Sequence, residues 1–386
     1  MQLDFTYYNP TKIIFGRSAL SHLREELANY GSRVLLVYGQ NAIKKLGIYD
    51  EILTILSDSG KTVVELSGIK PNPTYKQLLA GARLVRENQI DLILAVGGGS
   101  VLDCAKGISV SAYCQGDPWE RYWQNFEEVD NEIVPVGCVL TMAGTASEMN
   151  GGSVITNEEK MIKGGRVFPA YANPKFSLLN PEYTFSVPQK QMVSGVFDVL
   201  SHLMEQYFTG EDDNTTDYII EGVMESLIHS TRIALENPED YEARSNIMWC
   251  ATMGLNTITG LSKAQDWEVH MIEHQLGAYT DCPHGEGLAV LSVPYYKYIY
   301  QAGLAKFARF AKKVCGLAAE MPNEAAALAG IEALGSFIQE LGLPTTLREL
   351  GATAEMLPKI ASSAVKGGGY RQMEEEDILR VLEACF

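Results

Sequence analysis

The 386-residue sequence has few basic residues, few histidines and no long apolar run. It holds 31 Lys and Arg against 48 Asp and Glu, which gives a formal net charge of −17. A surface this acidic repels phosphate backbones and anionic lipids. We therefore expect neither a nucleic-acid nor a membrane partner. Hydrophobic residues make up 46% and charged residues 20%, which excludes a disordered or fibrous chain.

The seven cysteines are odd in number and form no Cys-x-x-Cys pair, so neither a disulfide framework nor a thiolate zinc site is indicated. The longest apolar runs, such as residues 92–96, are far shorter than the roughly 20 residues that span a bilayer. No basic and then apolar leader pattern is visible at the start. We therefore expect a cytoplasmic protein with reduced thiols.

The first half alternates short apolar runs with helical patterns, of which residues 75–87 are the clearest. Continuous apolar runs predict buried strands, here at residues 34–38, 62–66, 92–96, 133–140 and 176–179. Buried strands separated by helices imply a Rossmann-like parallel sheet with both faces covered. In such sheets ligands bind beyond the carboxyl ends of the strands.

The pattern changes to successive helices after residue 187. Helices are predicted at residues 193–207, 218–235, 241–255, 304–315 and 323–341, with a last one from near Glu374. We therefore expect two domains, an α/β dinucleotide-binding domain at 1–187 and an all-α metal-binding domain at 188–386.

A glycine-rich turn, residues 97–100, follows the third predicted strand and precedes a helical pattern. Glycines allow a ligand close to the backbone, and a helix start offers free N–H groups, so phosphate fits there. The turn is not a GxGxxG fingerprint, because Leu102 occupies the position of the third glycine, and it is not a P-loop. The alternative is a tight turn with a purely structural role. Residues 141–148 add hydroxyls at the same sheet edge, which favours a pyrophosphate cradle. Lys163, in a predicted turn at 158–164, would add a positive charge.

Three of the six histidines, His270, His274 and His284, fall in one short segment. His270 and His274 are four residues apart, hence on one helix face, and so are Asp198 and His202. Each pair can supply two ligands, and imidazoles with one carboxylate suit Zn²⁺ or Fe²⁺.

Two alternatives compete with a metal site of this kind. An Asp and a His four residues apart often form an intrahelical hydrogen bond. The segment from His270 to His274 is also a His-x-x-Glu-His metallohydrolase pattern, in which Glu273 would be the general base. That zinc hydrolase hypothesis leaves the glycine turn, Asp198 and His202 without a role.

Together these motifs resemble the iron-dependent (group III) alcohol dehydrogenase family, above all its butanol dehydrogenase and broad aldehyde reductase branch. The resemblance covers essentially the whole chain and implies a dehydroquinate synthase-like fold, with a Rossmann-like sheet domain before an all-α domain. It rests on residues 9–16, 71–73, 97–103, 116–119, 141–148, Asp198 with His202, 266–274 and 283–285.

The resemblance implies one divalent metal, Fe²⁺ or Zn²⁺, and assigns roles to the histidines. It implies that the ligands are Asp198, His202, His270 and His284, and that His274 is a catalytic residue that relays a proton. This argues against the hydrolase.

The resemblance also implies a set of nucleotide-binding positions. These positions are Gly97, Gly98, Gly99, Ser100, Asp103, Thr141, Thr145 and Lys163. Gly39 ends the first strand where NAD-specific members often carry Asp, so we expect NADP(H), with NAD(H) as the alternative and with Asn41 or Lys44 at the 2′-phosphate. Two departures from the family pattern are residues 40–42, where the branch is richer in Gly and Ser, and Asn180, where many members have Asp.

The implied activity is reduction of small aliphatic aldehydes to alcohols, and the reverse, by a homodimer. Asn150 and Trp267 are predicted to line the substrate pocket. A glycerol dehydrogenase or a dehydroquinate-synthase-like lyase of the same fold is an alternative, although residues 266–270 favour the butanol dehydrogenase branch. A binding module without catalysis would leave the buried Asp and His residues unexplained.

Overall fold

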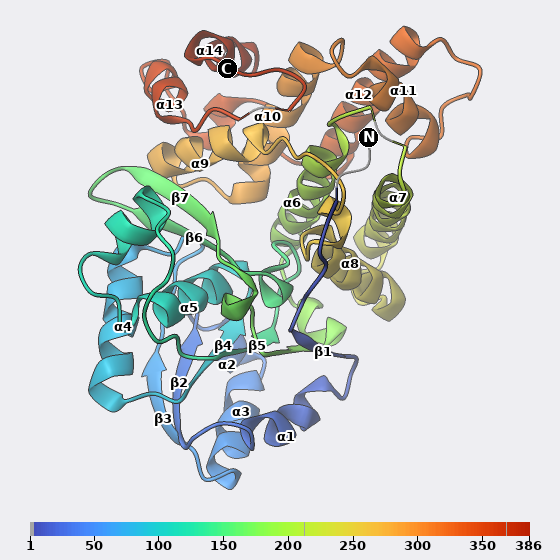
Figure 1. The fold of residues 1–386 in the computed structure, drawn as a ribbon. Coiled ribbons are helices and arrows are strands. Elements are labelled where there is room, and N and C mark those ends of the chain that lie inside the picture. The colour runs from blue at the N-terminus through green and yellow to red at the C-terminus, as the bar shows by residue number, and fades with distance from the viewer. Residues whose placement is uncertain (1–3, 212, 368) are drawn as a thin grey trace. The chain divides into compact units, whose positions relative to one another are not determined.

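The computed structural model describes residues 4–211, 213–367 and 369–386. These residues form two compact units (Figure 1). The sheet unit comprises residues 8–187, and the helical unit comprises residues 188–386 together with residues 4–7.

The sheet unit contains a six-stranded parallel sheet with the order β1-β8-β5-β4-β2-β3. Its strands are β1 (Lys12–Phe15), β2 (Arg33–Tyr38), β3 (Thr62–Leu66), β4 (Leu92–Gly97), β5 (Val136–Leu140) and β8 (Phe176–Leu179). The predicted parallel α/β sheet is thus confirmed. One predicted strand is too long, because β5 begins only at Val136, after Pro135, which has no N–H to donate to a neighbouring strand.

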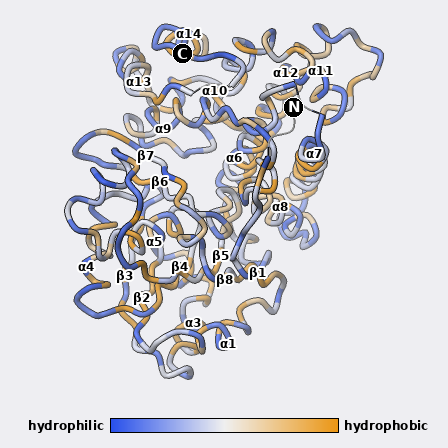
Figure 2. The backbone as a smooth tube through the Cα atoms, in the orientation of Figure 1, coloured by the Kyte–Doolittle hydropathy of each residue, from blue (hydrophilic) through white to orange (hydrophobic). Residues whose placement is uncertain are grey.

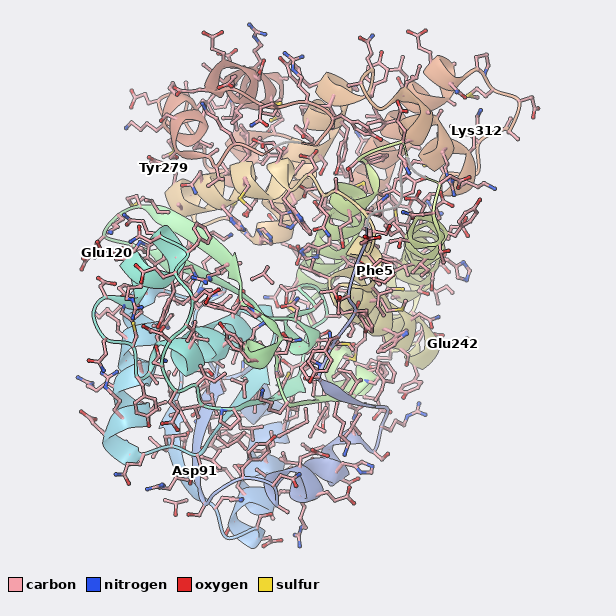
Figure 3. The ribbon with its side chains drawn as sticks, in the orientation of Figure 1. Phe5, Asp91, Glu120, Glu242, Tyr279 and Lys312 are labelled. Carbon is pink, nitrogen blue, oxygen red and sulfur yellow. The ribbon has the colours of Figure 1, made fainter. Side chains whose placement is uncertain are left out.

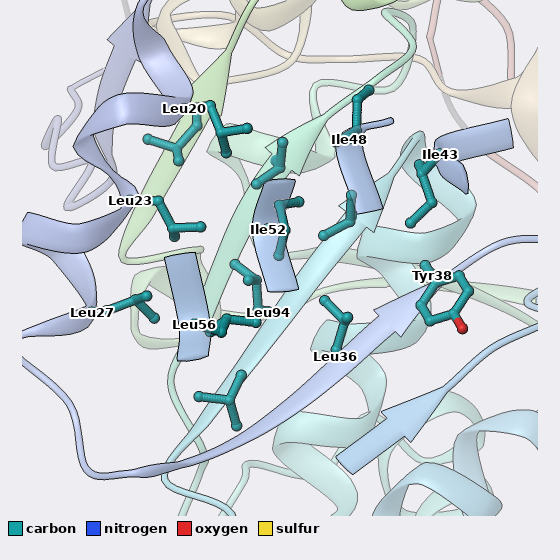
Figure 4. Close-up of a cluster of buried hydrophobic side chains, with 14 of the residues drawn as sticks. Leu20, Leu23, Leu27, Leu36, Tyr38, Ile43, Ile48, Ile52, Leu56 and Leu94 are labelled. Atoms are coloured by element: carbon teal, nitrogen blue, oxygen red, sulfur yellow. The ribbon is translucent and has the colours of Figure 1, made fainter. Parts of the chain in front are cut away.

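Helices cover both faces of this sheet. They are α1 (Leu23–Leu27), α2 (Ala42–Lys45), α3 (Ile48–Asp58), α4 (Tyr75–Asn88) and α5 (Gly99–Ser111). Leu36 and Leu94 pack with Leu23, Ile52 and other residues of α1 and α3 in one cluster (Figure 4). Their neighbours along the strands point to the opposite face, where α4 and α5 contact the sheet. Apolar colours accordingly dominate β2 and β4 in Figure 2.

Asp91 joins the amino ends of two neighbouring strands (labelled in Figure 3). Its carboxylate accepts hydrogen bonds from the backbone N–H of Arg33 (2.9 Å) and from the Arg33 guanidinium (3.2 Å). Gly31 permits this contact, because a Cβ there would lie 2.3 Å from Asp91 Cγ. The amino ends of β2 and β4 are therefore fixed to each other, at the end of the strands opposite the glycine turn.

A second, antiparallel pair of strands consists of β6 (Gly152–Asn157) and β7 (Ile162–Val167). Lys163 lies in β7 opposite Thr156 and is buried, so its predicted position in a turn is wrong. The sequence Ile-Lys-Gly-Gly-Arg-Val of β7 gives no strand signal, because it has two glycines and little apolar alternation.

Asn180 has a local reason to replace the Asp that is common in the family. Its Oδ1 accepts a hydrogen bond from the backbone N–H of Glu182 (3.1 Å) at the start of the 3₁₀ helix η5 (Pro181–Thr184). Its Nδ2 donates to the carbonyl oxygen of Arg17 (3.3 Å). A carboxylate could accept the first hydrogen bond but could not donate the second.

The amino-terminal part of the sheet unit is joined to its last strand. β1 pairs in parallel with β8, with Lys12 opposite Phe176. Asn9 donates to the carbonyl oxygen of Met149 (2.8 Å) and accepts from Nδ2 of Asn173 (3.4 Å). β1, which the sequence analysis did not predict, is thus an edge strand that depends on distant residues.

The helical unit follows the predicted succession of helices. It contains α6 (Gln189–Tyr207), α7 (Thr215–Glu236), α8 (Tyr241–Gly254), α9 (Glu268–Thr280), α10 (His284–Ile299), α11 (Leu304–Lys313), α12 (Asn323–Glu340), α13 (Leu357–Ser363) and α14 (Glu375–Ala384). α6 begins at Gln189, directly after Pro188, rather than at Val193. Across the part of the chain that the structure describes, no helix combines the length and apolarity needed to cross a membrane.

Candidate metal centre and nucleotide-binding turn

Helix α6 carries three buried polar residues on one face. Asp198 and His202 are each 4% exposed, and Glu205 is fully buried. Their spacing of four and then three residues places all three side chains along the same side of the helix. Such groups are costly to bury unless each finds a partner or binds a metal.

Three histidines surround one oxygen of Asp198. The Nε2 atoms of His202, His270 and His284 lie 3.4, 3.7 and 3.5 Å from Asp198 Oδ1. They come from α6, from α9 and from the first residue of α10. Ligand atoms about 2.1 Å from a tetrahedral metal are about 3.4 Å from one another, so this spacing is that of a metal site.

Two of these buried ligand atoms make no hydrogen bond in the part of the chain that the structure describes. They are Asp198 Oδ1 and His270 Nε2. Asp198, His202 and His270 also place ligand atoms within 4.8 Å of one another. Three imidazole nitrogens and one carboxylate oxygen suit Zn²⁺ or Fe²⁺, so the residues present fit a divalent metal.

Two further carboxylates orient the histidines. Glu205 is hydrogen bonded to Nδ1 of His270, and Glu273 to Nδ1 of His284. A carboxylate on Nδ1 fixes the tautomer and aims the lone pair of Nε2 at the common centre. The sequence analysis missed Glu205, although its spacing from His202 was a signal that could have found it.

The charges of the cluster favour a cation. Burial lowers the pKa of His202 to about 3, which keeps this imidazole neutral. Burial opposes protonation of His270, but Glu205 and Asp198 outweigh it and raise its pKa to about 10. Burial likewise opposes ionisation of Asp198, yet His202 and His284 hold its pKa below the usual range. The carboxylates of Glu205 and Asp198, which favour a proton on His270, favour a metal cation at the same place.

His274 and Trp267 adjoin the cluster. The ring centroid of His274 is 5.7 Å from that of His284, although His274 is not among the histidines around Asp198 Oδ1. The half-buried ring of Trp267 is 6.0 Å from His202 and 5.3 Å from His270. Both side chains are thus near enough to act on a molecule bound at the cluster.

In the sheet unit, the glycine turn contacts the loop that follows β5. A Cβ on Gly98 would lie 3.2 Å from Met142 Cβ, and one on Gly99 would lie 2.3 Å from Thr145 Oγ1. The φ angle of Gly98 is −90°, so close packing rather than backbone conformation demands glycine. Helix α5 begins here without a side-chain cap, and the N–H groups of Val101 and Leu102 donate to the carbonyl oxygen of Gly98 (3.0 and 3.3 Å). A helix start of this kind is a suitable place for an anion.

Other predicted nucleotide positions take part in internal contacts around this turn. The backbone N–H of Thr141 donates to the carbonyl oxygen of Gly97 (3.0 Å), and the hydroxyl of Ser100 donates to that of Pro71. The structure therefore brings Gly97–Ser100, Thr141 and Thr145 together at one edge of the sheet.

Asp103 and Asn150 support the loop from within the unit. Asp103 accepts hydrogen bonds from the Ser147 hydroxyl (2.5 Å) and from the backbone N–H of Val154 (2.9 Å). Asn150 Oδ1 accepts from Lys106 Nζ (3.0 Å), a fully buried ammonium that the sequence analysis missed. The predicted contacts of Asp103 with nucleotide and of Asn150 with substrate stay predictions.

The end of β2 presents the residues predicted to select the nucleotide. Gly39, the first residue after the strand, has no side chain, and Asn41 is exposed at the start of α2. The ammonium of Lys44 lies 4.5 Å from the ring centroid of Tyr49 and 5.2 Å from that of Tyr38. These rings hold a cation beside the strand end.

Comparison with known proteins agrees with this architecture. The family described as "Iron-containing alcohol dehydrogenase" matches residues 10–181, and "Fe-containing alcohol dehydrogenase family, C-terminal" matches residues 192–386. This chain belongs to the iron-containing alcohol dehydrogenase family, as its motifs predicted.

Among its relatives, the NADH-dependent butanol dehydrogenase A of Clostridium acetobutylicum is 38% identical over 391 residues, 100% of both chains. The NADPH-dependent aldehyde reductase YqhD of Escherichia coli is 36% identical over 97% of this chain and 96% of its own. The crystal structure of the NADH-dependent butanol dehydrogenase A of Thermotoga maritima superposes with a TM-score of 0.94, at 35% identity, over 99% of this chain and 98% of the other. These similarities confirm the predicted fold and the butanol dehydrogenase type. The relatives include an NADH-dependent and an NADPH-dependent enzyme, so they do not decide between the two nucleotides.

Proposed function

We propose that this protein is a metal-dependent, NAD(P)H-linked alcohol dehydrogenase that reduces small aliphatic aldehydes to alcohols and catalyses the reverse reaction. The observation that carries the proposal is the convergence of three imidazole Nε2 atoms on one oxygen of Asp198, at 3.4 to 3.7 Å. The substrate class is supported by the butanol dehydrogenases and the aldehyde reductase among the relatives.

Each residue of the metal cluster has a role in this proposal. A divalent cation supplies a Lewis acid for the carbonyl oxygen, and a reduced nicotinamide nucleotide supplies the hydride. Asp198, His202, His270 and His284 would hold the cation. His274, next to His284, would pass a proton to the developing alkoxide, and Trp267 would line the substrate pocket.

The nucleotide would bind in the sheet unit, with its pyrophosphate at the start of α5. The packing of Gly98 on Met142 and of Gly99 on Thr145 supports this placement, since it leaves the backbone N–H groups bare of side chains. Lys163 would add a positive charge. We propose a preference for NADP(H), because β2 is followed by no acidic side chain and Lys44 offers an ammonium at that end.

The test is oxidation of NADPH by butyraldehyde, followed at 340 nm. The chain is first stripped of metal with a chelator and then reloaded with Fe²⁺ or Zn²⁺. We expect activity only in the reloaded protein, and neither metal retention nor turnover in His270→Ala. His229→Ala, which changes an exposed histidine of α7, is the matched control and keeps the parent activity. Turnover near the parent value in metal-free His270→Ala would refute the proposal, and casein cleavage without NADPH oxidation would favour the hydrolase.

The proposal includes two further features, a homodimer, which the family resemblance implies, and a cytoplasmic location, which the cysteine pattern favours. Light scattering of the purified full chain tests the first, and a mass of one protomer would contradict it. Fractionation of the source cells tests the second.

A further inference from the structure

Glu205 contacts two parts of the metal cluster with one carboxylate. Its Oε1 is hydrogen bonded to Nδ1 of His270. Its Oε2 accepts hydrogen bonds from the backbone N–H groups of Val269 (2.9 Å) and His270 (3.3 Å). The side chain is fully buried, so these groups take the place of water around the charge.

The residue directly before helix α9 gives its first turn no side-chain cap. The residue that precedes the helix is Trp267, whose φ is +68° and whose side chain accepts no hydrogen bond from the first turn. The first N–H groups of a helix have no partner within the helix, and a carboxylate is the group that satisfies them best. Glu205, from α6, therefore caps α9 in place of Trp267.

The backbone of Glu205 adds a third connection to the same segment. Its carbonyl oxygen accepts a hydrogen bond from the N–H of Asp266 (3.0 Å), just before α9. One residue of α6 thus fixes the approach to α9, its first turn and the ring of His270. The ligands on α6, His202 and Asp198, lie about one and two turns earlier on the same helix face.

From these contacts we infer that Glu205 is the positioning residue that sets the metal affinity of the site. This inference rests on the metal site of the proposed function. Glu205 holds His270 both by its ring and by its backbone, in fixed register with two other ligands on α6. Loss of Glu205 therefore weakens metal binding.

The experiment measures Zn²⁺ affinity of the metal-free full chain by competition with a chromophoric chelator. We expect Glu205→Ala to bind Zn²⁺ about 10- to 100-fold more weakly than the parent, as for other groups that orient metal-bound histidines. Glu205→Gln should lie between them, because its amide oxygen still accepts a hydrogen bond, whereas its amide nitrogen accepts none. The visible spectrum of the Co²⁺-loaded Gln variant should also shift, since it reports the geometry of the ligands.

The matched control is Glu221→Gln. Glu221 is a buried carboxylate of the same unit that accepts hydrogen bonds from the Tyr207 hydroxyl (2.6 Å) and from Arg309. This variant should lower the melting temperature while leaving the Zn²⁺ affinity within about two-fold of the parent and the Co²⁺ spectrum unchanged. A general effect of losing a buried charge is thereby separated from the role of Glu205.

A folded Glu205→Ala variant with parent Zn²⁺ affinity overturns the inference, because Glu205 is then only a structural cap. If circular dichroism shows that this variant does not fold, Glu205→Gln decides, and parent affinity together with a parent Co²⁺ spectrum overturns the inference. A parent chain that binds no Zn²⁺ overturns the metal site itself and the role of Glu205 with it. If the parent and both Glu205 variants bind Zn²⁺ equally well, the metal site stands and only the role of Glu205 is overturned.

Discussion

Nδ1 of His284 is hydrogen bonded to the fully buried carboxylate of Glu273. A general base in a zinc hydrolase must reach a water on the metal, but this carboxylate is engaged by a histidine that itself faces Asp198. The His-x-x-Glu-His pattern of α9 therefore supplies one candidate ligand, His270, and one group that orients another. The geometry contradicts the metallohydrolase interpretation of the segment.

Replacing Glu273 tests this conclusion. Glu273→Gln should bind Zn²⁺ about ten-fold more weakly, because His284 loses its charged partner, yet regain most of its reductase turnover when metal is in excess. Reductase assays over a range of Zn²⁺ concentrations, with a casein assay beside them, would show this. Peptidase activity in the parent that disappears in the variant would instead establish Glu273 as a general base.

The glycine turn permits a second test, which concerns the nucleotide. Gly99→Ala places a methyl group 2.3 Å from Thr145 Oγ1, so the turn and the neighbouring loop must move apart. We expect the KM for NADPH to rise at least about ten-fold, the equivalent of one lost hydrogen bond to a charged group, with metal content unchanged. Gly222→Ala in α7 is the control, since a Cβ there meets nothing within 4 Å and should stabilise the helix by about 0.5 to 1 kcal/mol. If Gly99→Ala keeps the KM of the parent for NADPH, the pyrophosphate does not bind at this turn.

Nucleotide preference is tested by two adjacent lysines of α2. Both lysines are exposed, but Lys44 lies beside the rings of Tyr38 and Tyr49 at the end of β2. Lys44→Ala should raise the KM for NADPH about ten-fold and leave that for NADH unchanged, because only NADPH carries the 2′-phosphate. Lys45→Ala should change neither. A parent protein with the lower KM for NADH would contradict the proposed NADP(H) preference.

Lys106 predicts an unusual dependence of stability on pH. Burial lowers its pKa to about 8, against about 10.4 in an unfolded chain, so between these values the unfolded state binds the extra proton. Stability contributed by this residue therefore rises as the pH increases from 8 toward 10.4. Between pH 8 and 9.5 the parent should gain on the order of 2 kcal/mol relative to Lys106→Met, at 1.36 kcal/mol per pH unit. Urea unfolding of both proteins at the two pH values measures the difference, and a constant gap would contradict the assignment.

The fold was largely predictable where burial produces a simple pattern. β2 and β4 lie in the middle of the sheet and are buried on both faces, so their sequences are continuous apolar runs. β1 is a four-residue edge strand with two exposed positions, and β7 contains two glycines. Neither has the pattern on which such a prediction depends.

The four candidate ligands were predictable from helical spacing and the family resemblance, whereas the groups that orient them were not. Asp198 and His202 are four residues apart, and the structure places them together with His270 and His284. Glu205 acts on residues 64 and 65 positions away, so its role depends on how α6 and α9 pack. For the same reason the hydrogen bond between Lys106 and Asn150, 44 residues apart, is invisible in the sequence.

The pairing of β1 with β8 bears on how the chain is made. Asn9 and Asn173, which hydrogen bond beside these strands, are separated by 164 residues. At about 5–20 residues per second, a ribosome needs on the order of ten to thirty seconds between them. During that time the nascent amino terminus has no strand to pair with, and the growing sheet has an open edge. Translation that stops before β8 therefore leaves β1 without the strand that it pairs with.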